Sequence, residues 1–451
     1  MRILIIGAVA AGAKAAAKAK RLLPDAEIVV YTDDTHVSYS ACGIPYYIEG
    51  NFDDYRTLLV RSVEDFQKSG VSVYIRHKVL KIIKESKQVL VQNLDDNKSF
   101  LVSYDKLIIA TGANPIIPPI RNNCFKNIFK VRKIEDAIDI KNKLEDTKRA
   151  VIIGGGYIGL EMLEALVRNN IYTTLIERGN YLMPVLDEDM SDLVKTQLLE
   201  IAEHKFEIVT GHSAVEFCGD NDGVLSVETD NGNIYDADMV IICAGVKPNV
   251  ELAEDAGIKL GITGAIKVNR KMETSEADIY ACGDCCEENH IITNEPVWMP
   301  LGSNANKEGR CAAINACGGE DEFFGVLSSA VTRCFGITIS MTGINEKVAQ
   351  KAGFDVISTT VNKFDRVGYM PNAQNITLKL IADKKTGKLL GGQAVGSAGS
   401  DKRINTLATA LLGGLTVSEF ERNDLTYAPP FSTTIDPLLN AAQILRDKIN
   451  S

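Results

Sequence analysis

The first part of the chain repeats one pattern of apolar and polar positions. A short, continuously apolar run, Arg2–Ile6, precedes a small-residue turn and an alanine-rich segment, Ala13–Leu23, that we expect to be helical. A second run, Ala150–Ile153, likewise precedes a glycine turn and a predicted helix, Leu160–Asn169. Continuous apolar runs of this length are typical of strands buried on both faces of a parallel sheet. The pattern therefore predicts two α/β units.

Each predicted unit continues with a second strand and ends with a further apolar strand, which we call the closing strand. The second strands are Ala26–Tyr31 and Tyr172–Ile176. The closing strands end in small-residue turns, which contain Ala110, Thr111 and Gly112 in the first unit and Gly245 in the second. Two similar modules predict two bound nucleotides, one in each.

From about Phe323 the pattern changes to the alternation that is typical of antiparallel strands. The predicted elements are strands in Val331–Thr342, Asp355–Phe364 and Ile376–Ala382, a hairpin turn at Lys384–Gly387, a helix over Asp401–Leu412 and a final helix from Asp436. We therefore expect an α/β fold with two Rossmann-like domains and a C-terminal α+β dimerisation domain. The expected boundaries are 1–112 with 246–322, then 113–245, then 323–451.

The first turn approximates the dinucleotide fingerprint G-x-G-x-x-G. Glycine is needed first for the turn and last for close helix–strand contact, and small residues between them let a pyrophosphate approach the helix N-terminus. The turn consists of Gly7, Ala8, Val9, Ala10, Ala11 and Gly12. An acidic residue that binds the ribose is expected where Thr32 stands, so we predict that the next residue, Asp33, binds it instead. The alternative is that Asp33 belongs to a solvated surface turn.

The second turn is a complete fingerprint. It contains Gly154, Gly156 and Gly159, with Tyr157 and Ile158 before the last glycine. Glu177 ends the next strand about 20 residues later, where a carboxylate can bond a ribose 2′-hydroxyl. A carboxylate there would repel the 2′-phosphate of NADPH, so we expect NADH as the electron donor. The positive charge of Arg178 beside it could bind that phosphate, so NADPH stays an alternative.

Composition narrows the class of protein without identifying it. The chain has 451 residues, 45% hydrophobic and 24% charged, with a net charge of −10 that argues against nucleic acid as a partner. Its ten cysteines form no disulfide framework or zinc pattern, which suits a reducing cytoplasm. No apolar run reaches the roughly 18 residues of a membrane span. We expect a cytoplasmic protein without a metal site.

Cys42 is the main candidate for chemistry. It follows the second strand, within Ser38–Tyr47, at the predicted start of a short helix whose N-terminus would lower the pKa of the thiol. The next cysteine is Cys124, so a redox partner must arrive with the substrate. A buried structural cysteine is the alternative.

Together these motifs, with the apolar strand that runs into Gly283 and Asp284, resemble the flavin-dependent pyridine nucleotide–disulfide oxidoreductases. The resemblance implies FAD in the first module, held by Gly7, Gly12 and Asp284 with Ala305 on the following helix, and NADH or NADPH in the second. A lone Cys42 is similar to the single-cysteine branch: coenzyme A disulfide reductases, NADH oxidases and NADH peroxidases. Ala10 replaces the histidine of the oxidases and peroxidases, which favours the reductases.

The resemblance also implies a homodimer with an active site shared across the interface. Tyr369 and Tyr427 stand where the reductases place two tyrosines donated by the partner. Candidate contacts to coenzyme A are Lys18, Arg21, Ser38, Asn306 and Lys307. The expected activity is reduction of coenzyme A disulfide through a Cys42 mixed disulfide. The alternatives are reduction of persulfide or polysulfide, an oxidase or peroxidase that uses Cys42 sulfenic acid, and electron transfer to a rubredoxin-like protein.

Overall fold

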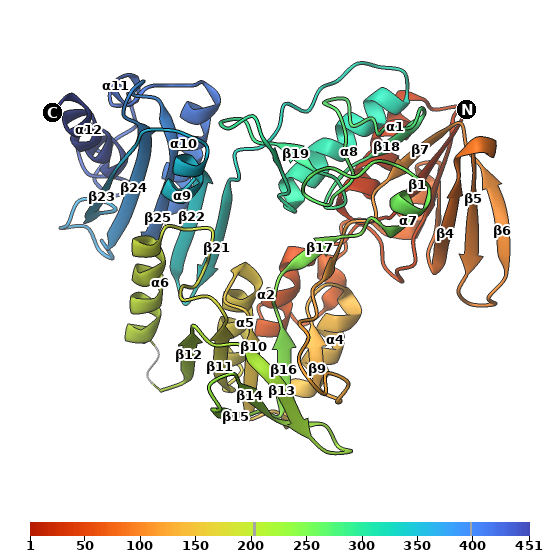
Figure 1. The fold of residues 1–451 in the computed structure, drawn as a ribbon, viewed down its shortest axis with the longest axis horizontal. Coiled ribbons are helices and arrows are strands. Elements are labelled where there is room, and N and C mark those ends of the chain that lie inside the picture. Colours follow the sequence, from red (N-terminus) through yellow and green to blue (C-terminus); the bar gives the residue numbers. More distant parts are fainter. Residues whose placement is uncertain (202–203, 397–398) are drawn as a thin grey trace.

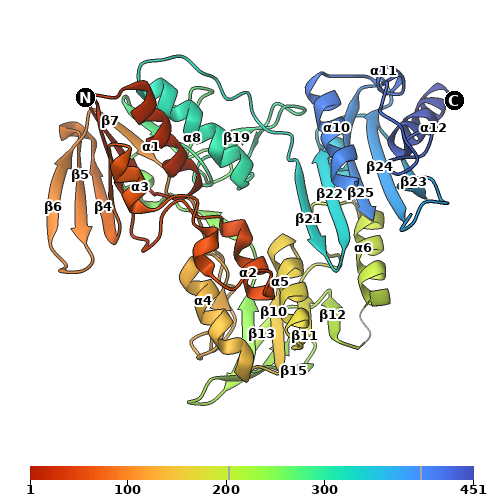
Figure 2. The same ribbon diagram turned by 180° about the vertical axis from the view of Figure 1, so that it is seen from behind.

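In a computed structural model, which describes residues 1–201, 204–396 and 399–451, the chain folds into three lobes (Figure 1). The N-terminus and the C-terminus lie in different lobes, and the third lobe lies below both (Figures 1 and 2). A parallel sheet forms the centre of the first lobe and of the lower lobe, and an antiparallel sheet forms the centre of the C-terminal lobe. The predicted α/β fold class is confirmed.

The sheet of the first lobe is parallel and combines segments far apart in the sequence. Its strands, in spatial order, are β18 (Ile279–Ala281), β7 (Lys106–Ile109), β1 (Arg2–Ile6), β2 (Glu27–Tyr31) and β3 (Val71–Tyr74). Helices α1 (Ala10–Leu22) and α8 (Gly302–Ala316) lie against each other (Figure 2). They can approach closely because Gly309 has no side chain: a Cβ there would lie 2.3 Å from the Ala11 carbonyl oxygen.

The lower lobe contains a second parallel sheet. Its strands, in spatial order, are β12 (Phe206–Thr210), β11 (Tyr172–Glu177), β10 (Arg149–Ile153), β16 (Met239–Ile242) and β9 (Ile128–Lys130). Its helices are α4 (Ile134–Lys143), α5 (Tyr157–Arg168) and α6 (Glu188–Ile201). Both helices that follow glycine turns begin three residues earlier than predicted, because the last fingerprint glycine lies inside the first turn of each helix.

The C-terminal lobe is built on an antiparallel sheet. Its strands, in spatial order, are β21 (Ala330–Cys334), β22 (Ile337–Gly343), β25 (Leu389–Gly396), β24 (Asn375–Asp383) and β23 (Val356–Phe364). Val331–Thr342, predicted as one strand, is two strands, because Gly336 at φ +82° reverses the chain. The hairpin turn at Lys384–Gly387 is confirmed. The helices are α9 (Glu346–Lys351), α10 (Ser400–Leu412), α11 (Val417–Phe420) and α12 (Pro437–Asn450).

Smaller elements complete the lobes, and one pair of short strands lies where the chain crosses between two of them. One small antiparallel sheet contains β4 (His77–Ile83), β5 (Gln88–Asn93) and β6 (Ser99–Ser103). Another contains β13 (Ala214–Gly219), β14 (Val224–Thr229) and β15 (Ile234–Asp236). Two antiparallel pairs are β8 (Ala113–Pro115) with β17 (Val246–Pro248), and β19 (Glu288–Asn289) with β20 (Pro296–Val297). The short helices are α2 (Ile44–Glu49), α3 (Val63–Lys68) and α7 (Glu251–Asp255). Pairing of β8 with β17 places the two chain crossings between the first and lower lobes side by side. The predicted domain boundaries stay a prediction.

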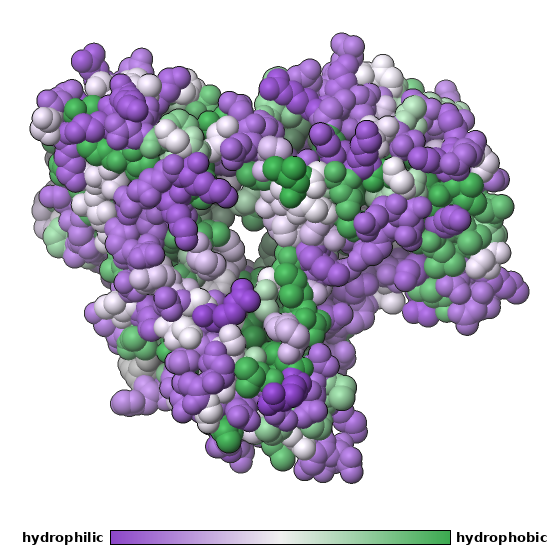
Figure 3. Space-filling model, viewed as in Figure 1, coloured by the Kyte–Doolittle hydropathy of each residue, from purple (hydrophilic) through white to green (hydrophobic). Residues whose placement is uncertain are grey.

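Within the described residues, no helix is both long and apolar enough to cross a membrane. The surface in Figure 3 is largely hydrophilic, and its hydrophobic side chains form small groups.

Candidate active site

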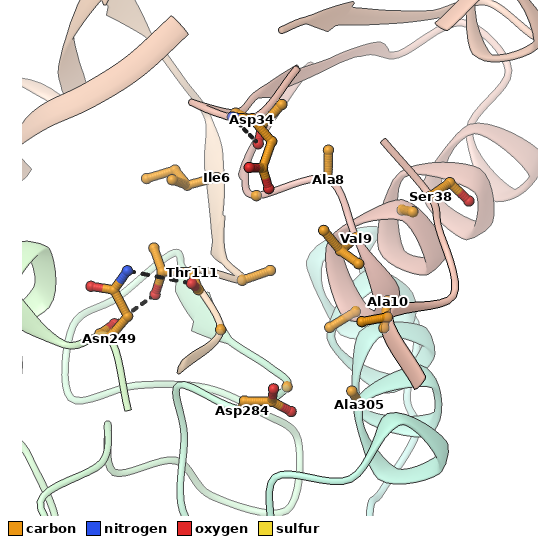
Figure 4. A pocket seen from close by; sticks show the side chains of 18 of the residues that line it. Ile6, Ala8, Val9, Ala10, Asp34, Ser38, Thr111, Asn249, Asp284 and Ala305 are labelled. Atoms are coloured by element: carbon orange, nitrogen blue, oxygen red, sulfur yellow. Dashed lines mark hydrogen bonds between the residues drawn. The ribbon is translucent and has the colours of Figure 1, made fainter. Parts of the chain in front are cut away.

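A cavity of about 1140 Å³ opens at the carboxyl ends of the first parallel sheet. Val9, Ala10 and Ala305 line one wall, and Asp284 lies across the cavity from the first two (Figure 4). The cavity is lined by these residues of the predicted FAD site: Gly7, Ala8, Val9, Ala10, Ala11, Asp33, Ala110, Thr111, Gly112, Gly283, Asp284 and Ala305. The fold therefore brings together segments that are nearly 300 residues apart.

The glycines of the first turn are required by backbone contacts. Gly7 has φ +101°, and a Cβ there would lie 2.2 Å from the Ala110 carbonyl oxygen. A Cβ on Gly12 would lie 2.0 Å from the Gly7 oxygen, so Gly12 fits behind the turn and not in the cavity wall. Contacts under 3 Å to backbone cannot be relieved by a side-chain rotation. These glycines let helix α1 start directly against β1.

The residues of the cavity fit FAD. Helix α1 starts at the cavity without a side-chain cap, so its first N–H groups are free to bind a pyrophosphate. Six cationic side chains line the same space: Lys14, Arg21, Arg61, Lys78, Arg132 and Lys133. Asp33 and Asp284 supply carboxylate oxygens that can accept hydrogen bonds from sugar hydroxyls. A long dinucleotide with two negative charges matches this arrangement.

Arg132 is a residue that the sequence prediction missed. It lies between β9 and α4, and its Nη2 atom is 3.2 Å from Asp284 Oδ2. Next to it, Lys133 forms an ion pair with Asp34, whose side chain is largely buried. These pairs join the lower lobe to the first lobe at the cavity. No local sequence signal marks Arg132, because its partner is 152 positions away.

Cys42 lies where the first and lower lobes meet. It lines the cavity, in a single turn over Ala41–Gly43, and its side chain is exposed. The six-residue helix α2 that follows packs against α5: Ile44 and Ile48 belong to the hydrophobic core of the lower lobe. Lys141 Nζ also donates to the Tyr47 carbonyl at 2.7 Å. Cys42 is therefore carried on a segment anchored to both lobes.

The expected lowering of the Cys42 pKa is wrong for this structure. Although Cys42 borders the open cavity, the protein around its thiol partly desolvates it and raises its pKa, and the Glu161 and Asp284 carboxylates raise it further. The Arg132 guanidinium acts in the opposite direction. The helix after Cys42 is too short, and begins too late, to outweigh desolvation and two carboxylates.

Glu161 is a second residue that the prediction missed. It projects from α5 of the lower lobe, and burial raises the pKa of its carboxyl group. Thr332 of the C-terminal lobe donates to Glu161 Oε1 at 2.9 Å. The same carboxylate raises the pKa of Cys42, Tyr46 and Cys243. Glu161 thus lies between the lobes at the lower end of the candidate site.

The predicted coenzyme A contacts divide into two groups. Arg21, Ser38 and Asn306 line the cavity, whereas Lys18 and Lys307 do not. Lys18 instead lies near Cys317, where burial raises the pKa of the thiol to about 11 and the Lys18 charge offsets part of that rise. Lys14 takes the cavity position, because residues seven apart on a helix share a face more closely than residues three apart. The basic face of α1 therefore consists of Lys14 and Arg21.

The second glycine turn has the geometry of the first. A Cβ on Gly154 would lie 2.4 Å from the Cys243 oxygen, and one on Gly159 would lie 2.0 Å from the Gly154 oxygen. A Cβ on Gly156 would meet nothing within 4 Å, so this position is open to a ligand. The N–H groups of Gly155 and Gly179 each donate to Glu177 at 2.7 Å, which fixes the carboxylate beside the turn.

The remaining predicted residues lie elsewhere. Tyr157 and Ile158 form the first turn of α5, and Gly245, at φ +96°, precedes β17. Tyr369 and Tyr427 are exposed on the C-terminal lobe, 75% and 48% respectively, and do not line the cavity of their own chain.

The fold and the cavity define a class: an oxidoreductase with two dinucleotide-type glycine turns and an exposed cysteine at the first cavity. The description "Pyridine nucleotide-disulphide oxidoreductase" matches residues 1–309, and the dimerisation domain of the same family matches residues 330–438. The chain belongs to this family. The predicted enzyme class, an FAD-dependent NAD(P)H oxidoreductase, is confirmed.

Relatives of known name are similar along almost the whole chain. The NAD(P)H coenzyme A polysulfide/persulfide reductase of Pyrococcus horikoshii is 36% identical over 448 residues, covering 99% of this chain and 98% of that one. The coenzyme A disulfide reductase of Staphylococcus haemolyticus is 31% identical over 445 residues, covering 96% of each. The solved structure of an NAD-dependent persulfide reductase from A. fulgidus has a TM-score of 0.96 at 36% identity, covering 100% of this chain and 84% of that one.

Proposed function

We propose that this protein reduces coenzyme A disulfide with electrons from NAD(P)H, through a mixed disulfide between Cys42 and coenzyme A. The observation that carries the proposal is the position of Cys42. Within the described residues, it is the exposed cysteine that lines the cavity, whereas Cys124 is exposed elsewhere and Cys282, also at the cavity, is fully buried. A lone exposed thiol at a dinucleotide cavity suits a substrate that brings its own second sulfur.

Cys42 acts as the nucleophile. Its thiolate attacks one sulfur of the disulfide, the Cys42–S–S–CoA bond forms, and the other coenzyme A leaves as a thiolate. Arg132 favours the anionic form of Cys42, since a nearby positive charge stabilises a thiolate. FAD, when bound in the cavity, supplies the two-electron transfer from NAD(P)H that cleaves the mixed disulfide. Coenzyme A then leaves as a thiol and Cys42 is again a thiolate.

The basic face of α1 supports the choice of coenzyme A. Lys14 and Arg21 are cavity cations beyond the glycine turn, and Ser38 and Asn306 line the same cavity. Coenzyme A carries several phosphate charges, which these groups would bind by charge-assisted hydrogen bonds. We also propose that NADH is the preferred donor, because Glu177 is fixed beside the second glycine turn.

A homodimer completes the proposed site. The C-terminal lobe matches the family's dimerisation domain, and its Tyr369 and Tyr427 are exposed on a single chain. We propose that these tyrosines reach the cavity of the other protomer, where Tyr427 protonates the leaving coenzyme A thiolate and Tyr369 orients it. General acid catalysis of this kind contributes about 10²–10⁴-fold.

Reduction of a coenzyme A persulfide or polysulfide is the second candidate. It is favoured by the names of the relatives in P. horikoshii and A. fulgidus, each 36% identical to this chain. Cys42 would attack the coenzyme A sulfur of the persulfide and release hydrogen sulfide, and the same mixed disulfide would follow. The two activities differ in their first product, which is coenzyme A thiol or sulfide.

Steady-state rates decide between these candidates. NADH oxidation is measured with coenzyme A disulfide, coenzyme A persulfide, hydrogen peroxide and oxygen, with detection of free thiol and sulfide. The proposal expects the highest kcat/KM with coenzyme A disulfide, its loss in Cys42→Ser, and retention in the control Cys124→Ser. Equal rates in wild type and Cys42→Ser would refute the role of Cys42. A strong preference for the persulfide, with sulfide release, would select the second candidate.

A further inference from the structure

Two carboxyl side chains are buried behind the turn that carries Asp284. Glu308 of α8 is 1% exposed and Glu288 of β19 is 7% exposed. The Gly283 N–H donates to Glu308 Oε2 at 2.6 Å, and the Met299 N–H donates to Glu288 Oε2 at 3.0 Å. Neither residue lines the cavity, so neither belongs to the site described above.

The two carboxyl groups lie within hydrogen-bonding reach of each other, and a hydrogen bond between them would require a shared proton. Glu308 Oε1 is fully buried and receives no donor from the other groups in the described part of the chain. The polar group beside it is the Glu288 carboxyl group. An ionised carboxylate only accepts hydrogen bonds, so two ionised groups could not form this contact. One shared proton supplies the donor and leaves the pair with a single negative charge.

The surroundings favour this protonated pair. The titratable groups that face the two carboxyl groups are the Cys282, Cys285 and Cys286 thiols and the Asp284 carboxylate. Within the described residues, no lysine or arginine forms an ion pair with Glu288 or Glu308. Burial and the neighbouring Glu308 carboxyl group raise the pKa of Glu288 to about 10, and burial raises the pKa of Glu308. The pair thus holds its proton at neutral pH.

The contact with Gly283 connects the pair to the cofactor site. Gly283 has φ +80°, and a Cβ there would lie 2.8 Å from the Ala11 side chain, so the turn is held tightly against α1. Asp284, one residue later, faces the cavity (Figure 4). The hydrogen bond to Glu308 therefore helps to hold the backbone of the turn that carries Asp284.

We propose that Glu308 is a positioning residue for the flavin-binding turn, and that Glu288 shares one proton with it to keep it in place. Glu308 fixes the Gly283 N–H and so directs Asp284 into the cavity. This inference depends on FAD binding by this family, and it is independent of which sulfur compound is reduced.

The shared proton makes retention of FAD dependent on pH. The pKa of Glu288 is higher in the folded protein than in the unfolded chain, so the folded state binds more protons between the two values. The stability that the pair contributes is complete below the unfolded pKa and is lost as the pH rises towards about 10. Loss of the proton places two negative charges beside Gly283, and the turn loosens.

The experiment follows FAD release by its fluorescence, together with thermal unfolding, on the holoenzymes of Glu288→Gln, Glu308→Gln, Glu308→Ala and the control Glu287→Gln. Glu287 is also buried, on the same loop, but bonds Thr263 instead of Glu308. Glu308→Ala should weaken FAD affinity at least about tenfold, since an N–H loses a charged acceptor. Glu308→Gln keeps an acceptor oxygen and should stay within about threefold of wild type.

The pH series isolates the shared proton. Wild type and Glu287→Gln should release FAD faster as the pH rises from about 7 to about 10, whereas Glu288→Gln should show a flat profile, because its amide donates without titrating. An unchanged FAD affinity in Glu308→Ala, or a Glu288→Gln profile identical to wild type, would overturn the proposal. If Glu308→Ala does not fold, the Glu288→Gln profile alone decides. Sulfur-substrate rates do not enter either readout, so failure here is separate from failure of the proposed function.

Discussion

Replacement of Lys379 tests what joins the lower lobe to the C-terminal lobe. Lys379 is in β24 and only 4% exposed, and its Nζ lies 3.2 Å from Asp187, 2.8 Å from Asp189 and 3.3 Å from Glu346. Asp187 is 7% exposed and belongs to the segment before α6. Lys379→Met would remove the cation and leave Asp187 buried without it.

The cost can be estimated from these contacts. Removing one partner of a buried ion pair costs about 3–5 kcal/mol. Gln393 Nε2 and the Glu346 N–H still donate to Asp187, at 2.8 and 2.9 Å, so we expect the lower end, about 3 kcal/mol. For a unit of 150–250 residues, this corresponds to a fall in Tm of roughly 6–12 °C.

The pH dependence of this deficit follows from Asp187. Burial already raises the pKa of Asp187, and loss of Lys379 would raise it further. A carboxyl group with a raised pKa in the folded state destabilises the protein increasingly as the pH rises. The deficit of Lys379→Met should therefore be larger at about pH 8 than at about pH 5.5.

The assay is calorimetric unfolding of the FAD-loaded protein at both pH values. Lys363→Met, an exposed lysine on the neighbouring strand β23, is the matched control and should change Tm by less than about 2 °C. A Tm for Lys379→Met equal to wild type would refute the role of this ion cluster. An equal deficit at the two pH values would refute the assignment to Asp187.

Three further predictions concern the nucleotide turns and Cys42. Gly12→Val should purify with less than about a tenth of the normal flavin absorbance, because the valine Cβ would meet the Gly7 carbonyl oxygen. The control Leu22→Ala, at the exposed end of the same helix, should keep the normal flavin absorbance. Full flavin absorbance in Gly12→Val would contradict the role of this backbone contact. Glu177→Gln should raise KM for NADH about tenfold with little change in kcat, whereas the exposed control Glu188→Gln should not; an unchanged KM would show that Glu177 does not bind the nucleotide. Glu161→Gln should lower the pKa of Cys42 and so accelerate its alkylation by iodoacetamide at about pH 7. Glu164→Gln, one turn later on the same helix, is the control. Equal alkylation rates in the two variants would exclude Glu161 as a cause of the raised pKa.

The parts of the fold that could be predicted are those with a strong local signal. Arg2–Ile6 and Ala150–Ile153 are continuous apolar runs beside glycine turns, and both form central parallel strands. Strand β25 was missed because Gly391 and Gly392 lie inside it, and glycine has a low strand propensity. A Cβ on Gly391 would lie 2.2 Å from the Ile344 oxygen, so close packing, which no local pattern reveals, requires glycine there.

The parts of the site that could not be predicted depend on long-range contacts. Arg132 and Glu161 approach Cys42 from the lower lobe, and nothing near them in the sequence indicates this. The Cys42 pKa was predicted from a helix N-terminus, whereas burial and two carboxylates dominate it. Lys18 is a predicted coenzyme A contact, although only the placement of α1 shows that Lys14 lines the cavity and Lys18 does not.

The most direct test of the central claim is the intact mass of the FAD-loaded protein after exposure to coenzyme A disulfide, followed by peptide mapping. We predict a gain of one coenzyme A on Cys42, which disappears when NADH is added under anaerobic conditions. The other exposed cysteine, Cys124, serves as the internal control and should remain unmodified. No adduct, an adduct on Cys124 instead, or a Cys42 adduct that NADH does not remove would contradict the account.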